Sequence, residues 1–473
     1  MVEISFNGHL YSVEEGSTVL AAAQKVGVPI PYFCNHPLLK PAGLCRMCLV
    51  EIRGFPKLQT ACTTTVKEGM EVLTETESVK QARREILEFH FAQHPLDCPE
   101  CDQAGACLLQ EWLYRFGFTR RRFYYQRDRK EKLVPLGKNL LLDRERCILC
   151  LRCLRFCDEV LGRHLLAVTE RGSRSCIATA GERRLETLYN GNLAQICPVG
   201  AILEKDMKAR VRNWLVQSRP TGCPLCSRGC ALLVDTPKEY PYLAHYPRLS
   251  RVQADSRREG RGGFICDIGR YTLKSLEENR LSKILQRGGE IDEARMRALL
   301  KEKLAVIETV VLSSWLSLEE IDEALLLFRD RLKLRILSWG RGDGDGDALL
   351  IRKERNPNGT YLRQRSVKPL VDGELSDPGN TLLFGDFFPD YPLFAEVIAR
   401  SRGFKALITP YRPSLKGETF DLVVPVCSFL EKEGSYMDFQ ERRWRSSKLF
   451  EPVGGTLREG EILSLLDGEG GEP

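Results

Sequence analysis

The first 80 residues alternate apolar and polar positions in a way that predicts a hairpin followed by a helix. Val2–Phe6 and Leu10–Val13 flank the Asn-Gly pair at 7–8, which is typical of a type I′ turn. Ser17 is expected to cap a helix through Ala21–Val26. Further short strands are expected at Lys57–Ala61 and Met70–Thr74, and a helix at Val79–His90. The amino terminus is therefore predicted to be a small α+β domain.

Helix-like and strand-like runs alternate again after residue 280. Helical periodicity covers Asp292–Ile307 and Leu318–Phe328. Short apolar runs typical of buried strands lie at Thr309–Leu312, Leu334–Leu337, Ala406–Ile408 and Leu422–Val426. This alternation predicts an open, largely parallel α/β sheet.

Length and composition fit a multidomain globular protein. A chain of 473 residues is too long for one core and suggests about three or more domains. The net charge of +6 is slight for this length and does not argue for nucleic-acid or membrane binding. The start, MVEISFNGHL, lacks the features of a signal peptide, and no window of about 18 uninterrupted apolar residues occurs. We expect a cytoplasmic or matrix-like protein without a transmembrane segment.

Cysteine spacing is the strongest chemical signal in the chain. Bunched C-x2-C pairs are typical of metal binding rather than of a disulfide framework. An iron–sulfur cluster takes four protein ligands, almost always thiolates. Fifteen of the 18 cysteines, with one histidine, form four consecutive sets: Cys34, Cys45, Cys48 and Cys62; His94, Cys98, Cys101 and Cys107; Cys147, Cys150, Cys153 and Cys197; Cys223, Cys226, Cys230 and Cys266. Four sets in series predict a row of redox centres.

The first set is predicted to hold a [2Fe–2S] cluster. A close pair, Cys45 and Cys48, is flanked by Cys34 and Cys62. A hairpin, one helix and a cysteine-bearing loop resemble a β-grasp ferredoxin, although the spacing C-x10-C-x2-C-x13-C has a longer first loop than the plant type. A structural zinc ribbon is the alternative.

The second set, H-x3-C-x2-C-x5-C, lacks a fourth cysteine. His94, just before Pro95 in an extended segment, is expected to complete a [4Fe–4S] site. His90, one helical turn earlier, is a competing candidate, and a structural role for His94 is the other alternative. A neutral imidazole in place of a thiolate should raise the potential of the cluster, as in Rieske centres.

The third set, C-x2-C-x2-C…C-P, is a [4Fe–4S] signature. Cys157 extends the run, but Asp158 rather than proline follows it, and no second run exists to form a partner cluster. The fourth ligand is therefore assigned to Cys197. Cys157 and Cys176 are expected to be unliganded thiols, the former buried.

The fourth set, C-x2-C-x3-C-x35-C, resembles the cluster domain at the front of molybdopterin oxidoreductases such as formate dehydrogenase. A [4Fe–4S] cluster is expected, with zinc as the alternative.

Two weaker features do not change this interpretation. Gly342–Asp347 with Glu354 resembles an EF-hand loop, but Ala348 stands where glycine is required, so a polar loop is expected.

The run Arg115–Lys132 is basic and rich in aromatic residues. It could clamp nucleic acid, but a solvated linker or a segment lying along an acidic partner is favoured.

In this order, the motifs resemble the large iron–sulfur subunit of NADH-quinone oxidoreductase, respiratory complex I. The likeness is close over residues 1–272. Beyond them, Asn279–Leu281 and the run from Asp421 to Tyr436 resemble landmarks of the molybdopterin oxidoreductase fold, but no cysteine stands where a molybdenum ligand would follow the cluster domain. The expected parts are a [2Fe–2S] ferredoxin-type domain (1–78), a His(Cys)3 [4Fe–4S] region (79–118), a [4Fe–4S] ferredoxin-like domain (119–215), a [4Fe–4S] domain of molybdopterin-oxidoreductase type (216–272) and a reduced, vestigial α/β domain (273–473).

The resemblance implies a relay subunit of a translocating oxidoreductase. Electrons would come from the flavin-bearing NADH-oxidising subunit and its small [2Fe–2S] partner, and would leave towards the quinone-module subunits of the peripheral arm, on the cytoplasmic face of the plasma membrane. The first three sets would serve the relay, with the fourth off the main path. One [2Fe–2S] and three [4Fe–4S] clusters are implied, without molybdopterin, nucleic acid or direct membrane contact. No GxGxxG follows a strand, so no nicotinamide or flavin site, and no complete active site, is expected.

Two rival functions remain open. An iron–sulfur subunit of an NAD-reducing hydrogenase or formate dehydrogenase shares the first three motifs, but catalysis of that kind needs more cysteines in the second half, where only Cys427 occurs. A zinc-ribbon nucleic-acid-binding protein would use the run Arg115–Lys132 and would be colourless.

Overall fold

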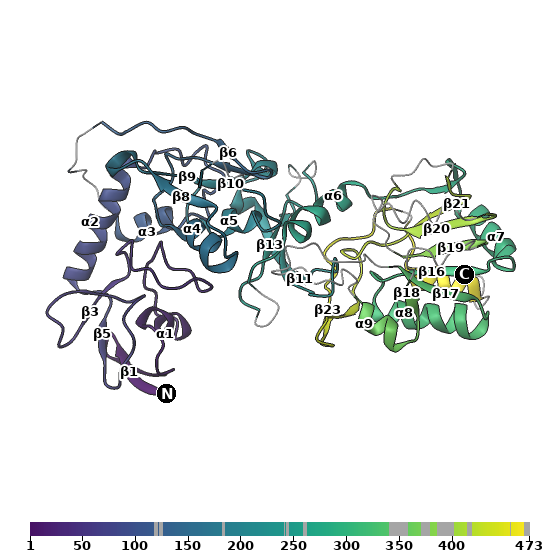
Figure 1. Cartoon of the computed structure of the whole chain (residues 1–473), viewed down its shortest axis with the longest axis horizontal. Coiled ribbons are helices and arrows are strands. Elements are labelled where there is room, and N and C mark those ends of the chain that lie inside the picture. The colour runs from purple at the N-terminus through teal and green to yellow at the C-terminus, as the bar shows by residue number, and fades with distance from the viewer. Residues whose placement is uncertain are drawn as a thin grey trace. The chain divides into compact units, whose positions relative to one another are not determined.

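The described residues of the chain form two compact units, Met1–Val216 and Gln217–Pro473 (Figure 1). Each unit has its own sheets and its own apolar cores. The computed structural model describes residues 1–117, 122, 126–181, 185–240, 242, 246–258, 263–339, 358–369, 379–385, 402–413, 419–454 and 456–467. None of the helices in this part of the chain is long and apolar enough to cross a membrane.

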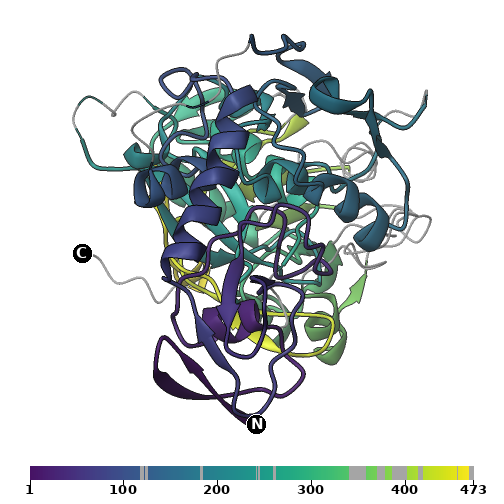
Figure 2. The same ribbon diagram turned by 90° about the vertical axis from the view of Figure 1, so that its left-hand side faces the viewer.

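The first unit begins with a five-stranded sheet and one helix, as predicted (Figure 2). The strand order is β2-β1-β5-β3-β4, and β1 and β5 are parallel. Asn7 (φ 51°) and Gly8 (φ 86°) form the turn of the predicted hairpin. The elements are β1 (Val2–Phe6), β2 (His9–Val13), α1 (Val19–Lys25), β3 (Leu49–Ile52), β4 (Gln59–Thr60) and β5 (Glu71–Leu73).

The cap of α1 differs from the prediction. Thr18, not Ser17, accepts the hydrogen bond from the Ala21 amide. The hydroxyl of Ser17 instead donates to the Glu14 carbonyl oxygen at 2.6 Å. The predicted Ser17 cap is wrong because that side chain is engaged in the preceding turn, and the neighbouring threonine takes over.

The remainder of the first unit combines short helices with two small antiparallel sheets. The predicted helix at Val79–His90 is confirmed and extends further at both ends. The helices are α2 (Glu77–Gln93), α3 (Leu108–Phe116), α4 (Arg152–Arg155), which continues into a π-helix (Phe156–Val160), and α5 (Gly191–Ile196). The sheets are β10-β7-β6, from β6 (Val134–Leu136), β7 (Leu140–Leu142) and β10 (Ile202–Glu204), and the pair β8 (Leu166–Thr169) and β9 (Cys176–Thr179).

The second unit contains a three-stranded antiparallel sheet, an eight-stranded sheet and a hairpin. The order of the large sheet is β15-β14-β21-β20-β19-β16-β17-β18, and every pairing from β21 to β18 is parallel. The small sheets are β11 (Val216–Gly222), β12 (Ala231–Pro237) and β13 (Arg251–Ala254), with the hairpin β22 (Ser435–Met437) and β23 (Arg443–Arg445). The strands of the large sheet are β14 (Ile284–Gln286), β15 (Gly289–Ile291), β16 (Thr309–Ser313), β17 (Arg335–Trp339), β18 (Lys368–Pro369), β19 (Thr381–Phe384), β20 (Lys405–Thr409) and β21 (Leu422–Pro425).

The predicted helices of this unit are present. Asp292 caps α7 through the Arg295 amide, and Ser317 forms a capping box at the start of α8. The predicted helix Leu318–Phe328 is α8 followed by a π-helical stretch. The elements are α6 (Leu273–Glu278), α7 (Glu293–Leu304), α8 (Leu318–Ala324), the π-helix Leu325–Arg331, α9 (Gly359–Gln364) and α11 (Glu459–Asp467). The EF-hand-like loop and the tail after Asp467 lie outside the described residues.

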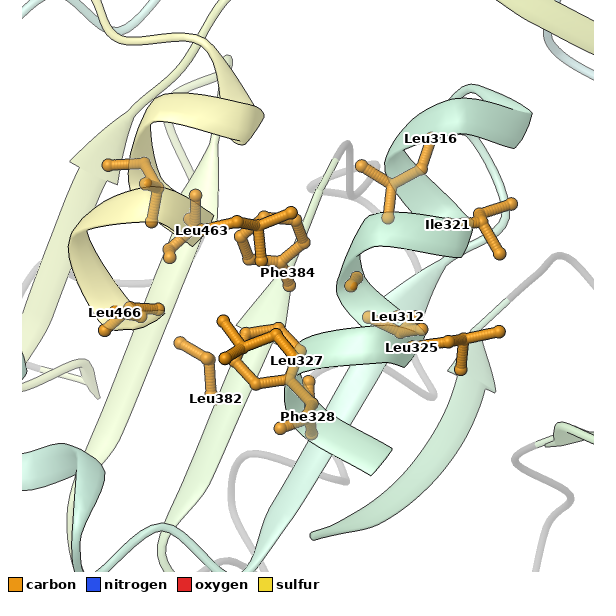
Figure 3. Packing of buried hydrophobic residues seen from close by; sticks show 14 of the residues in the cluster. Leu312, Leu316, Ile321, Leu325, Leu327, Phe328, Leu382, Phe384, Leu463 and Leu466 are labelled. Atoms are coloured by element: carbon orange, nitrogen blue, oxygen red, sulfur yellow. The ribbon is translucent and has the colours of Figure 1, made fainter. Parts of the chain in front are cut away.

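Both faces of the central strands β16, β19, β20 and β21 are buried. Val311, Leu383 and Leu407 face a cluster that includes side chains of the sheet β11-β12-β13. The alternate positions face α7, α8 and α11, and Figure 3 shows Phe384 with Leu463 of α11 and Phe328 of the π-helix. Strands buried on both faces read as continuous apolar runs, which explains why the sequence pattern identified them.

Candidate metal centres

The four thiols of the first set converge in the loops between α1 and the residues after β4. The Cys45 sulfur accepts hydrogen bonds from the Phe33 and Cys34 amides, at 3.3 and 3.5 Å. Contact with the Cys45 and Cys62 thiols lowers the pKa of Cys34, and contact with Cys62 lowers the pKa of Cys48. All four sulfur atoms are thus linked by contacts, and the donor set fits the predicted four-thiolate site.

Three cysteines of the second set lie between α2 and α3. The Cys101 amide donates to the Cys98 carbonyl oxygen at 3.3 Å, and the Cys101 thiol interacts electrostatically with Cys98 and Cys107. Cys101 and Cys107 are buried, whereas Cys98 is exposed. Burial raises the pKa of Cys107 to about 11. A free thiol there stays protonated at neutral pH, and metal binding would have to displace that proton.

His94 is placed as the sequence predicted, in an extended conformation directly after α2 (φ −70°, ψ 131°). Its Nδ1 atom is buried and has no hydrogen-bond partner among the described residues. Burial lowers the pKa of His94 to about 4, which keeps the ring in the neutral form that binds metals. The competing His90 ring packs edge-on against Phe33, with centroids 5.2 Å apart. An unpartnered ring nitrogen favours His94 over His90 as the fourth ligand.

The third set encloses a cavity in the first unit. Burial raises the pKa of Cys147 to about 12, so the cavity disfavours a thiolate that has no positive charge beside it. Iron would supply the compensating positive charge, and the donor set fits a four-thiolate cluster. The cavity is lined by Cys147, Cys150, Cys153 and Cys197, by the apolar residues Leu142, Ile148, Leu151, Ile177, Val199, Ala201 and Ile202, and by Arg152.

The fourth set gathers in the second unit. The Cys223 amide donates to the Cys230 carbonyl oxygen at 2.8 Å, and the Cys223 thiol interacts with the thiols of Cys226, Cys230 and Cys266. The Gly269 amide donates to the Cys266 sulfur at 3.4 Å. An amide donor to a ligand sulfur is one of the features that set cluster potentials. This donor set also fits a four-thiolate site.

The remaining cysteines have different surroundings. Cys157 and Cys427 are buried, and the expected burial of Cys157 is confirmed. Cys176 is half-buried, and its sulfur lies 3.3 Å from the Thr169 hydroxyl. Within the described ranges, no group of three or more His, Cys, Asp or Glu side chains is placed to hold a single metal ion. The ligand assignments of all four sets stay predictions.

Residues of the first three sets meet in one apolar cluster of the first unit. Cys45, Cys107 and Cys147 all pack against it, together with Phe33 and Val199. The other members from the sets are Cys150 and Cys197. Predicted ligand positions that are far apart in sequence therefore share one apolar cluster.

Two direct contacts join the second set to the third. The Leu108 amide donates to the Pro198 carbonyl oxygen at 3.0 Å, immediately after Cys107 and Cys197. Gly200 lies so close to Cys101 that a Cβ atom there would stand 2.2 Å from the Cys101 sulfur. Glycine is required at position 200 because a larger residue would displace this thiol.

The basic stretch pairs with carboxylates of its own unit. Arg122 lies 2.6 Å from Glu88 of α2, and Lys132 lies 3.3 Å from Glu145 and also pairs with Asp97. Residues 118–121 and 123–125 of the stretch lie outside the described residues. Arg122 and Lys132 therefore pair with the carboxylates Glu88, Asp97 and Glu145 of the same unit.

Sequence reasoning missed three residues that shape these sites. Arg152 and Arg155 lie in the cysteine run of residues 147–157. The prediction of metal ligands considered only the spacing of the cysteines and gave these arginines no role. Gly200 was visible only as part of the CPVG run. Arginines inside a cysteine run indicate that positive charge lies near the predicted site. Which cysteines they contact depends on the tertiary structure.

Three sequence families match the first unit. They are described as a 2Fe-2S iron-sulfur cluster binding domain (residues 1–77), the NADH-ubiquinone oxidoreductase-G iron-sulfur binding region (83–122) and the ferredoxin-like domain of NADH-quinone oxidoreductase subunit 3 (137–203). Among curated relatives, the NADH-quinone oxidoreductase G subunit of Streptomyces coelicolor is 37% identical over 293 residues, covering 61% of this chain and 34% of the relative. This chain is a homologue of that G subunit in its iron–sulfur domains. The predicted two-iron and four-iron ferredoxin-like domains are confirmed.

Other relatives extend this homology beyond one lineage. NADH-quinone oxidoreductase subunit 3 of Thermus thermophilus is 35% identical over 329 residues, covering 62% of this chain and 41% of the relative. The mitochondrial NADH-ubiquinone oxidoreductase 78 kDa subunit of Candida albicans is 37% identical, covering 61% and 39%. The chain thus spans roughly a third to two fifths of the length of these relatives.

A solved structure is also similar in sequence. It is a chain of an NAD+-reducing [NiFe]-hydrogenase in the H2-reduced state, 33% identical, with 44% of this chain and 90% of that chain covered and a TM-score of 0.41.

Proposed function

We propose that this chain transfers electrons as the iron–sulfur subunit of an NADH-quinone oxidoreductase. The observation that carries the proposal is the apolar cluster in which Cys45, Cys107 and Cys147 pack together. When bound, iron–sulfur clusters accept and release single electrons. The chain's own residues bring members of the three donor sets to one apolar cluster. Burial of this kind also tunes potential.

The contacts support a spatial order that differs from the sequence order. The third set touches the second through Leu108 and Pro198, and it touches the first through Arg155, which donates to the Cys34 carbonyl oxygen. We infer that electrons pass from the first set to the third and then to the second. His94, as a neutral ligand, would raise the potential at the end of this series.

The finer assignments belong to the same proposal. The chain would hold one [2Fe–2S] cluster and three [4Fe–4S] clusters on the four predicted ligand sets, with the fourth cluster off the main path. The second unit, with its open α/β sheet, would serve as scaffold without molybdopterin. The partners would be the flavin-bearing NADH-oxidising subunit, its small [2Fe–2S] companion and the quinone-module subunits, at the cytoplasmic face of the membrane.

Anaerobically purified full-length chain tests the proposal. We expect a brown protein whose iron and acid-labile sulfide contents match one two-iron and three four-iron clusters, with EPR signals that appear on dithionite reduction. NADH should reduce these clusters only when the flavin-bearing subunit is added. The Cys176→Ser variant is a matched control that should keep every signal. Stoichiometric zinc in a colourless chain would contradict the proposal.

A further inference from the structure

Arg152 is a buried arginine inside the cysteine run of the third set. Only 5% of its surface is exposed, and it opens α4 between Cys150 and Cys153. It is also the one charged residue among those that line the cavity of the third set. A guanidinium is always protonated in a protein, so a full positive charge borders that cavity.

The hydrogen bonds of Arg152 leave part of its guanidinium unused. Its Nη1 donates to the Ile196 carbonyl oxygen at 2.9 Å, directly before Cys197. Its Nε and Nη2 are buried and have no hydrogen-bond partner among the described residues. A buried cation with unsatisfied donors is costly unless an anion lies nearby.

Arg152 lies beside two of the predicted donor sets. It lines the cavity of the third set together with Cys150 and Cys197. Tyr32, two residues before Cys34, places its ring 5.8 Å from the guanidinium carbon. The charge therefore faces the third set on one side and the loop of the first set on the other.

We propose that Arg152 is a potential-setting residue shared by the first and third clusters. The inference rests on the proposed function, because it requires clusters at both sets. Reduction adds one negative charge to a cluster, and a fixed cation nearby stabilises the reduced form. One guanidinium between two centres raises both potentials together. A shift of both potentials in the same direction leaves the step between them nearly unchanged.

Redox titration of the full-length, cluster-loaded chain, followed by EPR, tests this role. In Arg152→Gln, the midpoints of the first and third clusters should both become more negative. The expected shift is at least a tenfold change in the ratio of oxidised to reduced cluster at fixed potential, about 59 mV for one electron. The midpoint of the second cluster should not change and serves as an internal reference.

Two further variants separate the charge from the structure. Arg144→Gln removes the same charge from the same unit, where Arg144 pairs with Glu131, and should leave all midpoints in place. Arg152→Lys keeps the positive charge and should give midpoints close to the unmodified chain. A shift in Arg152→Lys as large as that in Arg152→Gln, or loss of the third cluster in both variants, would overturn the role of charge.

The outcomes also distinguish this inference from the proposed function. Normal EPR signals with midpoints that do not respond to Arg152→Gln would overturn only the role of Arg152. The absence of iron–sulfur signals from the unmodified chain would overturn the proposed function itself.

Discussion

The guanidinium of Arg155 donates a hydrogen bond to the backbone carbonyl oxygen of Cys34, which lies 121 residues earlier in the chain. The same side chain donates to the Lys40 carbonyl oxygen, and the Lys40 amide donates to Glu159 at 2.8 Å. These contacts fasten the cysteine loop of the first set to the helical segment that carries Cys153. The distance between two donor sets thus depends on a few side chains of one short helix.

Replacing Arg155 should loosen this attachment locally. In Arg155→Ala, the loop from residue 34 to residue 40 should open at least about 10-fold more often, because each hydrogen bond from a charged donor is worth about 1.5–3 kcal/mol. Hydrogen–deuterium exchange of that peptide measures the change. Arg171→Ala, at an exposed position of the same unit, is the control. Equal exchange in the two variants would show that the Arg155 contact contributes nothing.

The identity of the nitrogen ligand can be decided by a matched pair of histidine variants. His94→Cys should lower the midpoint potential of the second cluster, because a thiolate adds a negative charge where imidazole is neutral. His90→Cys should leave that potential unchanged. Redox titration followed by EPR measures both. The opposite pattern would identify His90 as the ligand and assign His94 a structural role.

The fourth ligand of the third set can be tested in the same way. Cys197→Ser should abolish or strongly alter one four-iron signal, since Cys197 lines the cavity of that set. Cys157→Ser should retain all signals, since Cys157 is expected to be an unliganded thiol. Iron content and EPR spectra of the two purified variants provide the comparison. Loss of a cluster in Cys157→Ser alone would refute the assignment.

Gly222 is a sensitive position of the second unit. A Cβ atom there would lie 2.1 Å from Cζ3 of Trp444, a buried ring in the same apolar cluster as Cys223. Gly222→Ala should destabilise the unit by about 1–3 kcal/mol, the usual cost of overpacking a core. A lower urea midpoint would report this. Gly454→Ala is the control, since nothing lies within 4 Å of the added atom. Equal midpoints would mean that the Trp444 ring moves aside freely.

Local sequence determined most of the helices and strands, and it predicts which kinds of residue would serve as metal ligands. The Asn-Gly turn, the helix that follows Asp292 and the apolar runs of the large sheet are predicted correctly, because each depends on neighbouring residues or on burial of both sheet faces. The Ser17 cap failed because two adjacent residues could each serve, and only the preceding turn decided between them.

Cysteine spacing likewise predicts the donor sets, because several members of each set lie close together in sequence. It could not show that segments next to the third set contact both the first set and the second, or that Arg155 reaches the Cys34 carbonyl oxygen. Those relationships join residues 90 or more positions apart. They arise when separate loops pack into one apolar cluster, and only tertiary structure brings such loops together.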